Sequence, residues 1–130
     1  MLGFILVTHS GVGQPMIKAV EDILKEKVSI PCVEVDANQD IRLFHDKIRE
    51  SLETLKDRSG VLILTDLFGA TPSNICREFC RPGKIEMVSG CNLPMLLKAA
   101  TAQFPDNLDE VAQFLKKYGN ENIRICQGEP

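Results

Sequence analysis

The segment LGFILVT at residues 2–8 is the strongest indication of the fold, because it is almost continuously apolar and carries no charged side chain. Such a run is typical of a strand that is buried on both faces, as strands of parallel sheets are. The stretch VLILT at residues 61–65 has the same character, and Ile30 to Val35 and Ile85 to Val88 read as two further strands. The sequence therefore predicts a central sheet built from these four segments.

Apolar residues recur at helical spacing in the segments between and after these strands. Five helices are expected: from Pro15 to about Lys27, along Ile41 to Leu55, from Thr71 to about Phe79, after Asn92 through Ala100, and near Leu108 to Tyr118. Thr71 is predicted to cap its helix, with Pro72 at the first helical position, and Asn92 is predicted to cap the next one. The alternation predicts a doubly wound α/β fold with a mostly parallel sheet and helices on both faces.

Length and composition predict one soluble domain spanning residues 1–130. Apolar residues make up 44% and charged residues 25% of the chain, and the formal net charge is −3, which argues against a general nucleic-acid binder. No apolar run approaches the roughly 20 residues of a membrane span. The five cysteines form no Cys-x-x-Cys pair and no zinc-like spacing, so we expect a reducing, cytoplasmic location and no metal site.

Candidate functional residues follow the strands, because parallel sheets bind ligands at the carboxyl ends of their strands. His9 ends the first strand and Asp66 follows the third, so the two meet if those strands are neighbours. A carboxylate that accepts the proton of one ring nitrogen leaves the other nitrogen unprotonated and nucleophilic. Histidine can itself act as a covalent nucleophile.

The surroundings of His9 indicate what it would attack. Three helices begin at this edge of the sheet, and helix N-termini present free N–H groups to an anion. Each has a proline near its first turn: Pro15, Pro72 and Pro94. Glycines such as Gly69 allow a close backbone approach. Hydroxyl donors are supplied by Thr8, Ser10, Thr71 and Ser73. These loops contain no Lys or Arg, and together they predict a cradle for a phosphoryl group carried on His9.

The same loops carry a resemblance to a known family. The stretches ILVTHS at 5–10, DLFGATPSN at 66–74 and GCNLPM at 90–95 resemble the IIA domain of the mannose family of the bacterial phosphoenolpyruvate:sugar phosphotransferase system (PTS). The likeness runs in order over the whole chain. It implies a four-stranded parallel sheet of order 2-1-3-4. It also implies a homodimer in which a short antiparallel C-terminal strand, here Ile123 to Cys126, crosses to the partner's sheet.

The resemblance also implies a mechanism and partners. His9 would take a phosphoryl group from the phosphocarrier protein HPr and pass it to a IIB domain, without a metal or organic cofactor. Asp66 would hydrogen-bond Nδ1 of the histidine and leave Nε2 as the phosphorylated atom. Phe68 and Thr71 match the loop aromatic and the loop hydroxyl near the phosphoryl group, whereas Ser10 replaces a frequent glycine. Because the sequence ends at Pro130, the IIB acceptor is expected on a separate chain, for sugar uptake with a membrane permease complex or for regulation.

Other functions remain open from the residues alone. THSGVG at residues 8–13 loosely resembles the phosphate loop of a flavodoxin-like FMN-binding module, although the chain has no tryptophan and only one tyrosine. A response-regulator receiver is rejected, because it would need acidic residues after the first strand, where this chain has Thr8 and His9. A phosphohistidine phosphatase or mutase would need arginines at the phosphate, and these loops contain none. A non-catalytic regulatory binding protein on the same scaffold stays possible. His45, the other histidine, is interpreted as a surface or boundary residue.

Overall fold

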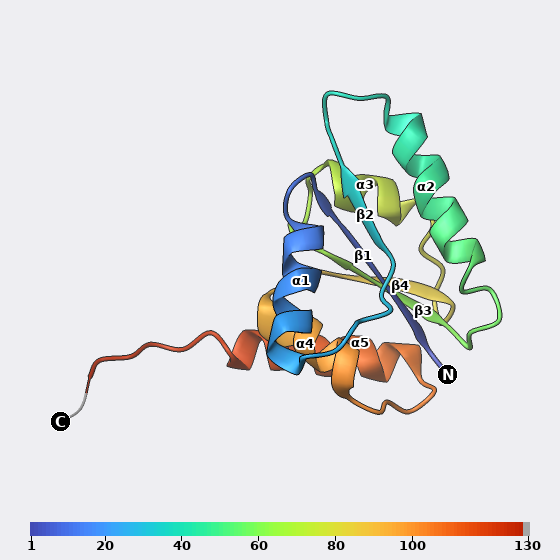
Figure 1. Ribbon diagram of the computed structural model, residues 1–130. Helices are drawn as coiled ribbons and strands as arrows, with labels where there is room; N and C mark the ends of the chain where they lie inside the picture. Colours follow the sequence, from blue (N-terminus) through green and yellow to red (C-terminus); the bar gives the residue numbers. More distant parts are fainter. Residues whose placement is uncertain (129–130) are drawn as a thin grey trace.

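Four parallel strands form the central sheet of the computed structural model, which describes residues 1–128 (Figure 1). They are β1 (Gly3–His9), β2 (Cys32–Val35), β3 (Val61–Thr65) and β4 (Ile85–Ser89). The strand order is β2-β1-β3-β4, and all three neighbouring pairs are parallel. The predicted α/β fold and its strand order are therefore confirmed.

Five helices cover the sheet on both faces. They are α1 (Gly13–Leu24), α2 (Ile41–Glu53), α3 (Thr71–Arg77), α4 (Leu93–Thr101) and α5 (Leu108–Glu121). Helices α1, α4 and α5 pack on one face, and α2 and α3 pack on the other (Figure 1). Within residues 1–128, no helix has the length and apolar character needed to cross a membrane.

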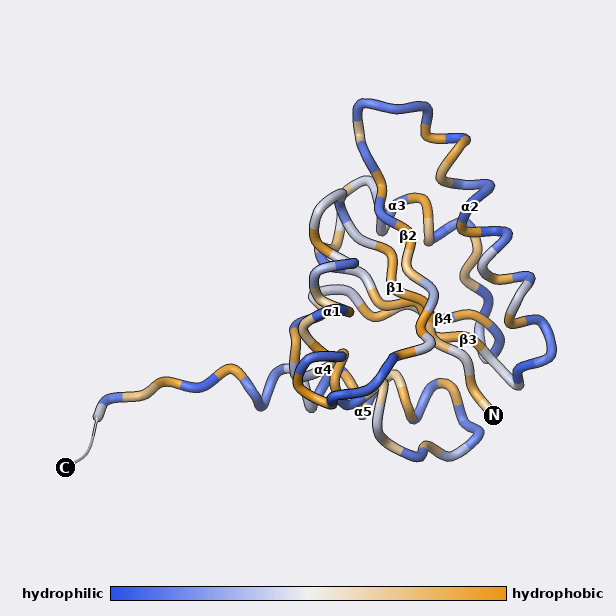
Figure 2. Tube along the Cα trace, viewed as in Figure 1, coloured by the Kyte–Doolittle hydropathy of each residue, from blue (hydrophilic) through white to orange (hydrophobic). Residues whose placement is uncertain are grey.

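The two inner strands supply both halves of the core. Leu6 and Leu64 point into the cluster under α1, α4 and α5, whereas Ile5 and Ile63 point into the cluster under α2 and α3. All four side chains are completely buried. This follows from the alternation of side chains along a strand, which sends every second residue to the opposite face. Figure 2 shows the hydrophobic strands running through the middle of the fold, with hydrophilic segments at the outer turns.

Several element boundaries differ from the sequence-based expectation, and two of the differences have a clear physical reason. Strand β2 begins at Cys32 rather than Ile30, because Pro31 has no N–H to donate to a neighbouring strand. Thr71 is the first residue of α3 rather than its cap, and Ala70 takes the cap position without a side-chain hydrogen bond. The cap predicted for α4 is confirmed, since the Asn92 side chain accepts a hydrogen bond from the backbone N–H of Met95 at 3.1 Å.

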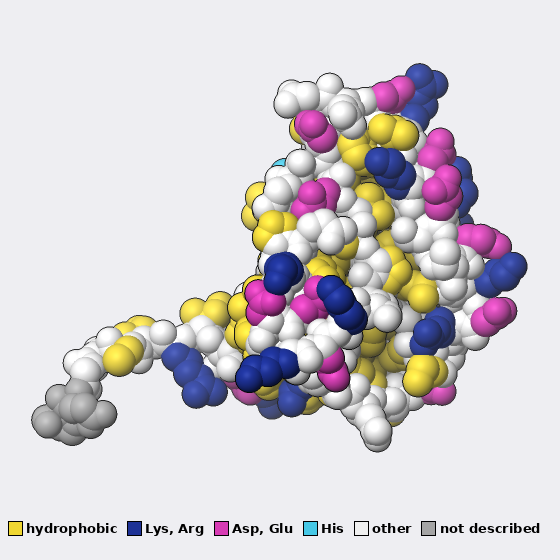
Figure 3. Space-filling model, viewed as in Figure 1, with side chains coloured by type: hydrophobic (Ala, Val, Ile, Leu, Met, Phe, Trp, Pro, Cys, Tyr) yellow, Lys and Arg dark blue, Asp and Glu magenta, His cyan; other side chains and the backbone are white. Residues whose placement is uncertain are grey.

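The expected last strand is absent from the single chain. Ile123 to Cys126 follow α5 as an extended tail that points away from the body (Figures 1 and 3). The side chains of Ile123 and Ile125 are 73% and 88% exposed. A strand needs a neighbour to accept and donate its backbone hydrogen bonds, and none lies beside this tail among residues 1–128. The single chain therefore forms no strand at residues 123–126, and the exchanged strand, which needs a partner subunit, stays a prediction.

The start of α1 packs so closely that it tolerates only glycine at residue 13. A Cβ atom added to Gly13 would lie 2.6 Å from Sγ of Cys32 and 2.7 Å from Oγ1 of Thr8. Gly to Ala normally stabilises a helix, but here we expect Gly13→Ala to lower the free energy of unfolding by about 1–3 kcal/mol through overpacking. Urea unfolding checks this against Gln14→Ala, whose side chain is exposed. Equal or higher stability of Gly13→Ala would contradict it.

Candidate functional site

His9 and Asp66 lie in contact at the carboxyl edge of the sheet. Strands β1 and β3 are neighbours with Val7 opposite Thr65, so the last residue of β1 lies beside the first residue after β3. Nδ1 of His9 is 2.9 Å from Oδ2 of Asp66. The backbone N–H of His9 donates to the same oxygen at 3.1 Å. The fold thus brings together the two residues that the sequence singled out.

This contact sets the chemistry of the ring. A carboxylate oxygen only accepts hydrogen bonds, so Nδ1 carries the proton and Nε2 keeps its lone pair. Within residues 1–128, no hydrogen bond engages Nε2 of His9. The His9 side chain is 39% exposed and that of Asp66 only 14%. The ring is therefore open to a reacting partner, while the carboxylate behind it is shielded from solvent.

The second oxygen of Asp66 and the nearby thiol of Cys91 complete the electrostatic setting. Oδ1 of Asp66 is buried and has no hydrogen-bond partner among the described residues. Burial, with a smaller contribution from Asp66, raises the pKa of the Cys91 thiol to about 12. Cys91 is therefore a protonated thiol at neutral pH, and it does not compete with His9 as a nucleophile.

Two of the predicted hydroxyl donors are buried and already engaged. Thr8 donates to the carbonyl oxygen of His9 at 2.9 Å. Ser73 accepts from the backbone N–H of Gly69 at 2.9 Å and donates to the carbonyl oxygen of Ala70 at 3.1 Å. Both side chains are completely buried, so they shape the loops rather than face a ligand. Ser10 is exposed and Thr71 is half-buried, and these hydroxyls remain accessible.

The three helix N-termini at this edge are not equivalent. The backbone N–H of Gln14, in the first turn of α1, donates to Oε2 of Glu34 at 2.9 Å. At the start of α4, the backbone N–H of Met95 donates to Oδ1 of Asn92 in the same way. Before α3, the backbone N–H groups of Ala70 and Thr71 form no hydrogen bond within residues 1–128. Among the described residues, the start of α3 is therefore the one of the three at which no side-chain oxygen accepts a hydrogen bond from a first-turn N–H.

Sequence reasoning missed the role of Glu34. Its position in β2 pairs with Thr8 in β1, which places its carboxylate beside the loop that leads into α1. The strand register would have indicated this neighbour, because Glu34 is the single charged residue of a short, otherwise apolar strand. Its carboxylate makes the α1 side of the edge less favourable for a second anion.

The loops after β1 and β3 contain glycines with a positive φ angle, and the loop after β3 also exposes two large apolar side chains. Gly11 and Gly69 both have a φ angle of 83°, which L side chains rarely adopt. Leu67 and Phe68 are 57% and 69% exposed, unusually high for large apolar residues beside a site. Leu93 instead packs against the core cluster.

Among residues 1–128, the other His, Cys, Asp and Glu side chains do not form a metal-binding cluster with His9. No group of three His, Cys, Asp or Glu side chains in the described part of the chain is arranged to hold a metal ion. His45 lies on α2, where its Nε2 is 3.1 Å from Oε2 of Glu78 and its ring packs on Phe79. Its side chain is only partly exposed.

Comparison with known proteins gives a consistent assignment. The EIIA-man family model, described as PTS system fructose IIA component, matches residues 3–116. The sorbose-specific EIIA component of Lacticaseibacillus casei is 31% identical over 118 residues, which cover 90% of this chain and 85% of that protein. The mannose-specific EIIAB component of Escherichia coli is 24% identical over 99% of this chain, but the chain spans only 41% of that protein's length.

Solved structures agree in fold. A mannose/sorbose-specific IIA subunit from Enterococcus faecalis superposes with a TM-score of 0.87 at 24% identity, covering 98% of this chain and 96% of that one. An EIIA component from Streptococcus agalactiae gives a TM-score of 0.83 at 22% identity, covering 96% and 97%. The family match covers most of the sequence, and it includes His9 at the end of β1 and Asp66 directly after β3. The chain therefore belongs to the EIIA-man family of phosphotransferase-system IIA components.

Proposed function

We propose that this chain is a phosphoryl carrier of a sugar phosphotransferase system. His9 accepts a phosphoryl group from phosphorylated HPr and passes it to a IIB domain in the cytoplasm. The observation that carries the proposal is the contact between Nδ1 of His9 and Oδ2 of Asp66, at 2.9 Å, which leaves Nε2 free on an exposed ring. Family membership supports the same class of reaction.

The proposed step exchanges one nitrogen–phosphorus bond for another. The Nε2 lone pair of His9 attacks phosphorus on the donor histidine, whose own N–P bond breaks and whose ring nitrogen keeps the electron pair. The proton on Nδ1 stays in the hydrogen bond to Asp66, whose negative charge offsets the positive charge that develops on the ring. In the second transfer, the acceptor attacks the same phosphorus, the bond between phosphorus and Nε2 of His9 breaks, and Nε2 keeps the electron pair.

The loops around His9 are assigned to binding the phosphoryl oxygens and to contacting the protein partners. We assign the phosphoryl oxygens to the free backbone N–H groups of Ala70 and Thr71, with the Thr71 and Ser10 hydroxyls as further donors. Gly69 and the buried Ser73 hold this loop in shape. The exposed Phe68, next to the loop, is assigned to the surface that the protein partners contact.

Phosphoryl transfer from phosphoenolpyruvate tests the proposal directly. The chain is mixed with enzyme I and HPr from its own source organism, and its intact mass is measured. We expect a gain of one phosphoryl group that is labile to acid and stable to base. No gain, with HPr shown to be charged, would overturn the carrier function. Visible absorbance of a bound flavin would then favour the FMN alternative.

We further propose a dimer in which the C-terminal tail of one subunit adds to the sheet of the other. Strand β4 is an edge strand, and the side chains of Ile85, Glu86 and Met87 are only half-buried. A recess of about 350 Å³ lies along β4 between Phe68 and α5. The tail is extended and carries two exposed isoleucines, as a strand that lacks its partner would.

Removal of residues 123–130 tests the exchanged strand. The tail contributes nothing to the buried core, so we expect the shortened chain to fold and to elute as a monomer where the full chain elutes as a dimer. Size-exclusion chromatography with light scattering measures this, and removal of residues 128–130 alone is the control. A shortened chain that remains an unchanged dimer would contradict the exchange.

A further inference from the structure

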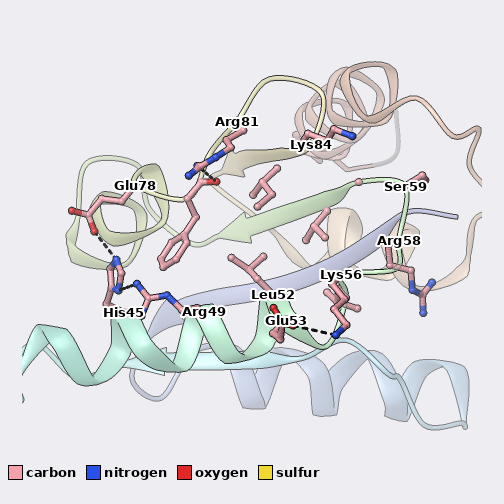
Figure 4. A pocket seen from close by; sticks show the side chains of 15 residues that line it. His45, Arg49, Leu52, Glu53, Lys56, Arg58, Ser59, Glu78, Arg81 and Lys84 are labelled. Atoms are coloured by element: carbon pink, nitrogen blue, oxygen red, sulfur yellow. Dashed lines mark hydrogen bonds and ion pairs between the residues drawn. The ribbon is translucent and has the colours of Figure 1, made fainter.

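A groove lies at the amino edge of the sheet, opposite the edge that carries His9. It has a volume of about 580 Å³ and runs between α2 and the segment that joins α3 to β4 (Figure 4). Val61 and Ile85, the first residues of β3 and β4, line it, whereas His9 ends β1 at the carboxyl edge. Five-residue strands separate the two edges by about 16 Å, at ~3.3 Å per residue. The groove is therefore a separate feature of the fold.

The groove is basic in an acidic protein. Five Lys and Arg side chains line it against two glutamates, although the chain has a formal net charge of −3. Both glutamates are already paired: Glu53 with Lys56 at 3.3 Å and Glu78 with His45 at 3.1 Å. Within residues 1–128, Arg81 and Lys84 form no salt bridge. These two exposed cations leave a net positive potential over one wall of the groove.

The floor of the groove is apolar. Leu52 comes from α2, Phe79 follows α3, and Val61 and Ile85 begin two strands. The guanidinium of Arg49 lies 6.0 Å from the centre of the Phe79 ring, on the α2 side. An occupant that fits must therefore combine apolar side chains for the floor with carboxylates for the rim.

The placement of the cations decides between a single phosphate group and a row of carboxylates as the anion that binds here. In Figure 4, Arg81 and Lys84 lie on one side of the groove and Arg49 and Lys56 on the α2 side, spread along its length. They do not converge on one point, as donors around a single phosphate do. We propose that this groove, defined by Arg49, Leu52, Phe79, Arg81, Lys84 and Ile85, docks an acidic, amphipathic segment of a partner protein in an extended conformation.

A synthetic peptide of alternating Glu and Leu, acetylated and amidated, is the probe. In an extended chain its leucines share one face and its carboxylates the other. Titrated into the ¹⁵N-labelled full chain without any phosphoryl donor, it should shift the amide signals of Leu52, Phe79, Lys84 and Ile85. The binding should saturate and weaken as salt is raised. A peptide of alternating Lys and Leu should not bind.

Charge reversal completes the test. The double variant Arg81→Glu, Lys84→Glu should bind the acidic peptide about tenfold more weakly, because two rim cations become repulsive. Its matched control is Lys25→Glu, Lys27→Glu, which makes the same charge change in the exposed loop after α1. Circular dichroism confirms folding, and Lys84→Glu alone replaces a double variant that fails to fold.

Several results would overturn the docking proposal. They are the absence of saturable binding, equal affinity in the double variant, and shifts centred on the His9 loops. Full competition by inorganic phosphate would identify a small-anion site instead. Concentration-dependent shifts of the same groove residues without peptide would identify a second copy of this chain as the occupant. Because no outcome depends on phosphoryl transfer, failure here and failure of the carrier function are distinguishable.

Discussion

His9→Ala should gain no phosphoryl mass in the enzyme I and HPr assay. The substitution removes the only ring nitrogen that the site exposes, and no other described nucleophile replaces it. The Cys91 thiol is protonated, since burial raises its pKa to about 12. His45 lies on α2, where its ring is held by Glu78 and Phe79. The loss should therefore be complete rather than partial.

The fold should survive this substitution. The His9 side chain is 39% exposed, and the backbone N–H of residue 9 keeps its bond to Oδ2 of Asp66. We expect the free energy of unfolding to fall by about 1–3 kcal/mol, because a hydrogen bond to a charged carboxylate is lost. His45→Ala is the matched control and should accept phosphate as the parent chain does. Phosphorylated His9→Ala would show that another residue is the acceptor.

Asp66→Asn should slow phosphoryl acceptance by about 10²–10⁴-fold, in the range known for loss of a carboxylate behind a catalytic histidine. The amide oxygen must remain opposite Nδ1, because an amide nitrogen there would face the backbone N–H of His9. The geometry is thus kept, but the negative charge that offsets the developing positive charge on the ring is lost. Rapid-quench measurement of the phosphorylation rate tests this.

The same substitution should also cost stability. The amide NH₂ must take the place of Oδ1, which is buried without a partner among residues 1–128. That position is unsatisfied in both the parent chain and the variant, but the two hydrogen bonds from His9 then end on a neutral oxygen, which lowers the free energy of unfolding by about 1–2 kcal/mol. Asp57→Asn removes the same charge at an exposed position and should change neither quantity. A parental rate for Asp66→Asn would mean that the pairing of His9 with Asp66 has no part in the transfer.

Much of the fold was predictable because its signals are local. The continuous apolar runs in β1 and β3 require burial on both faces, and in α/β chains only a parallel sheet between helix layers provides it. The Asn92 cap was equally predictable from its side-chain chemistry. The start of α3 was not, because the hydroxyl of Ser73 bonds Gly69 and leaves the cap position to Ala70.

The sheet, its two-sided burial and the placement of His9 and Asp66 at the ends of strands follow from the sequence alone, because they depend on periodicity and on the chain order of strands and helices. Which groups are free to act depends on the folded arrangement. Thr8 and Ser73 are buried and engaged, and Glu34 occupies the start of α1. The tail finds no neighbour within the described chain. These outcomes depend on contacts between side chains that are distant in sequence, which no local pattern records.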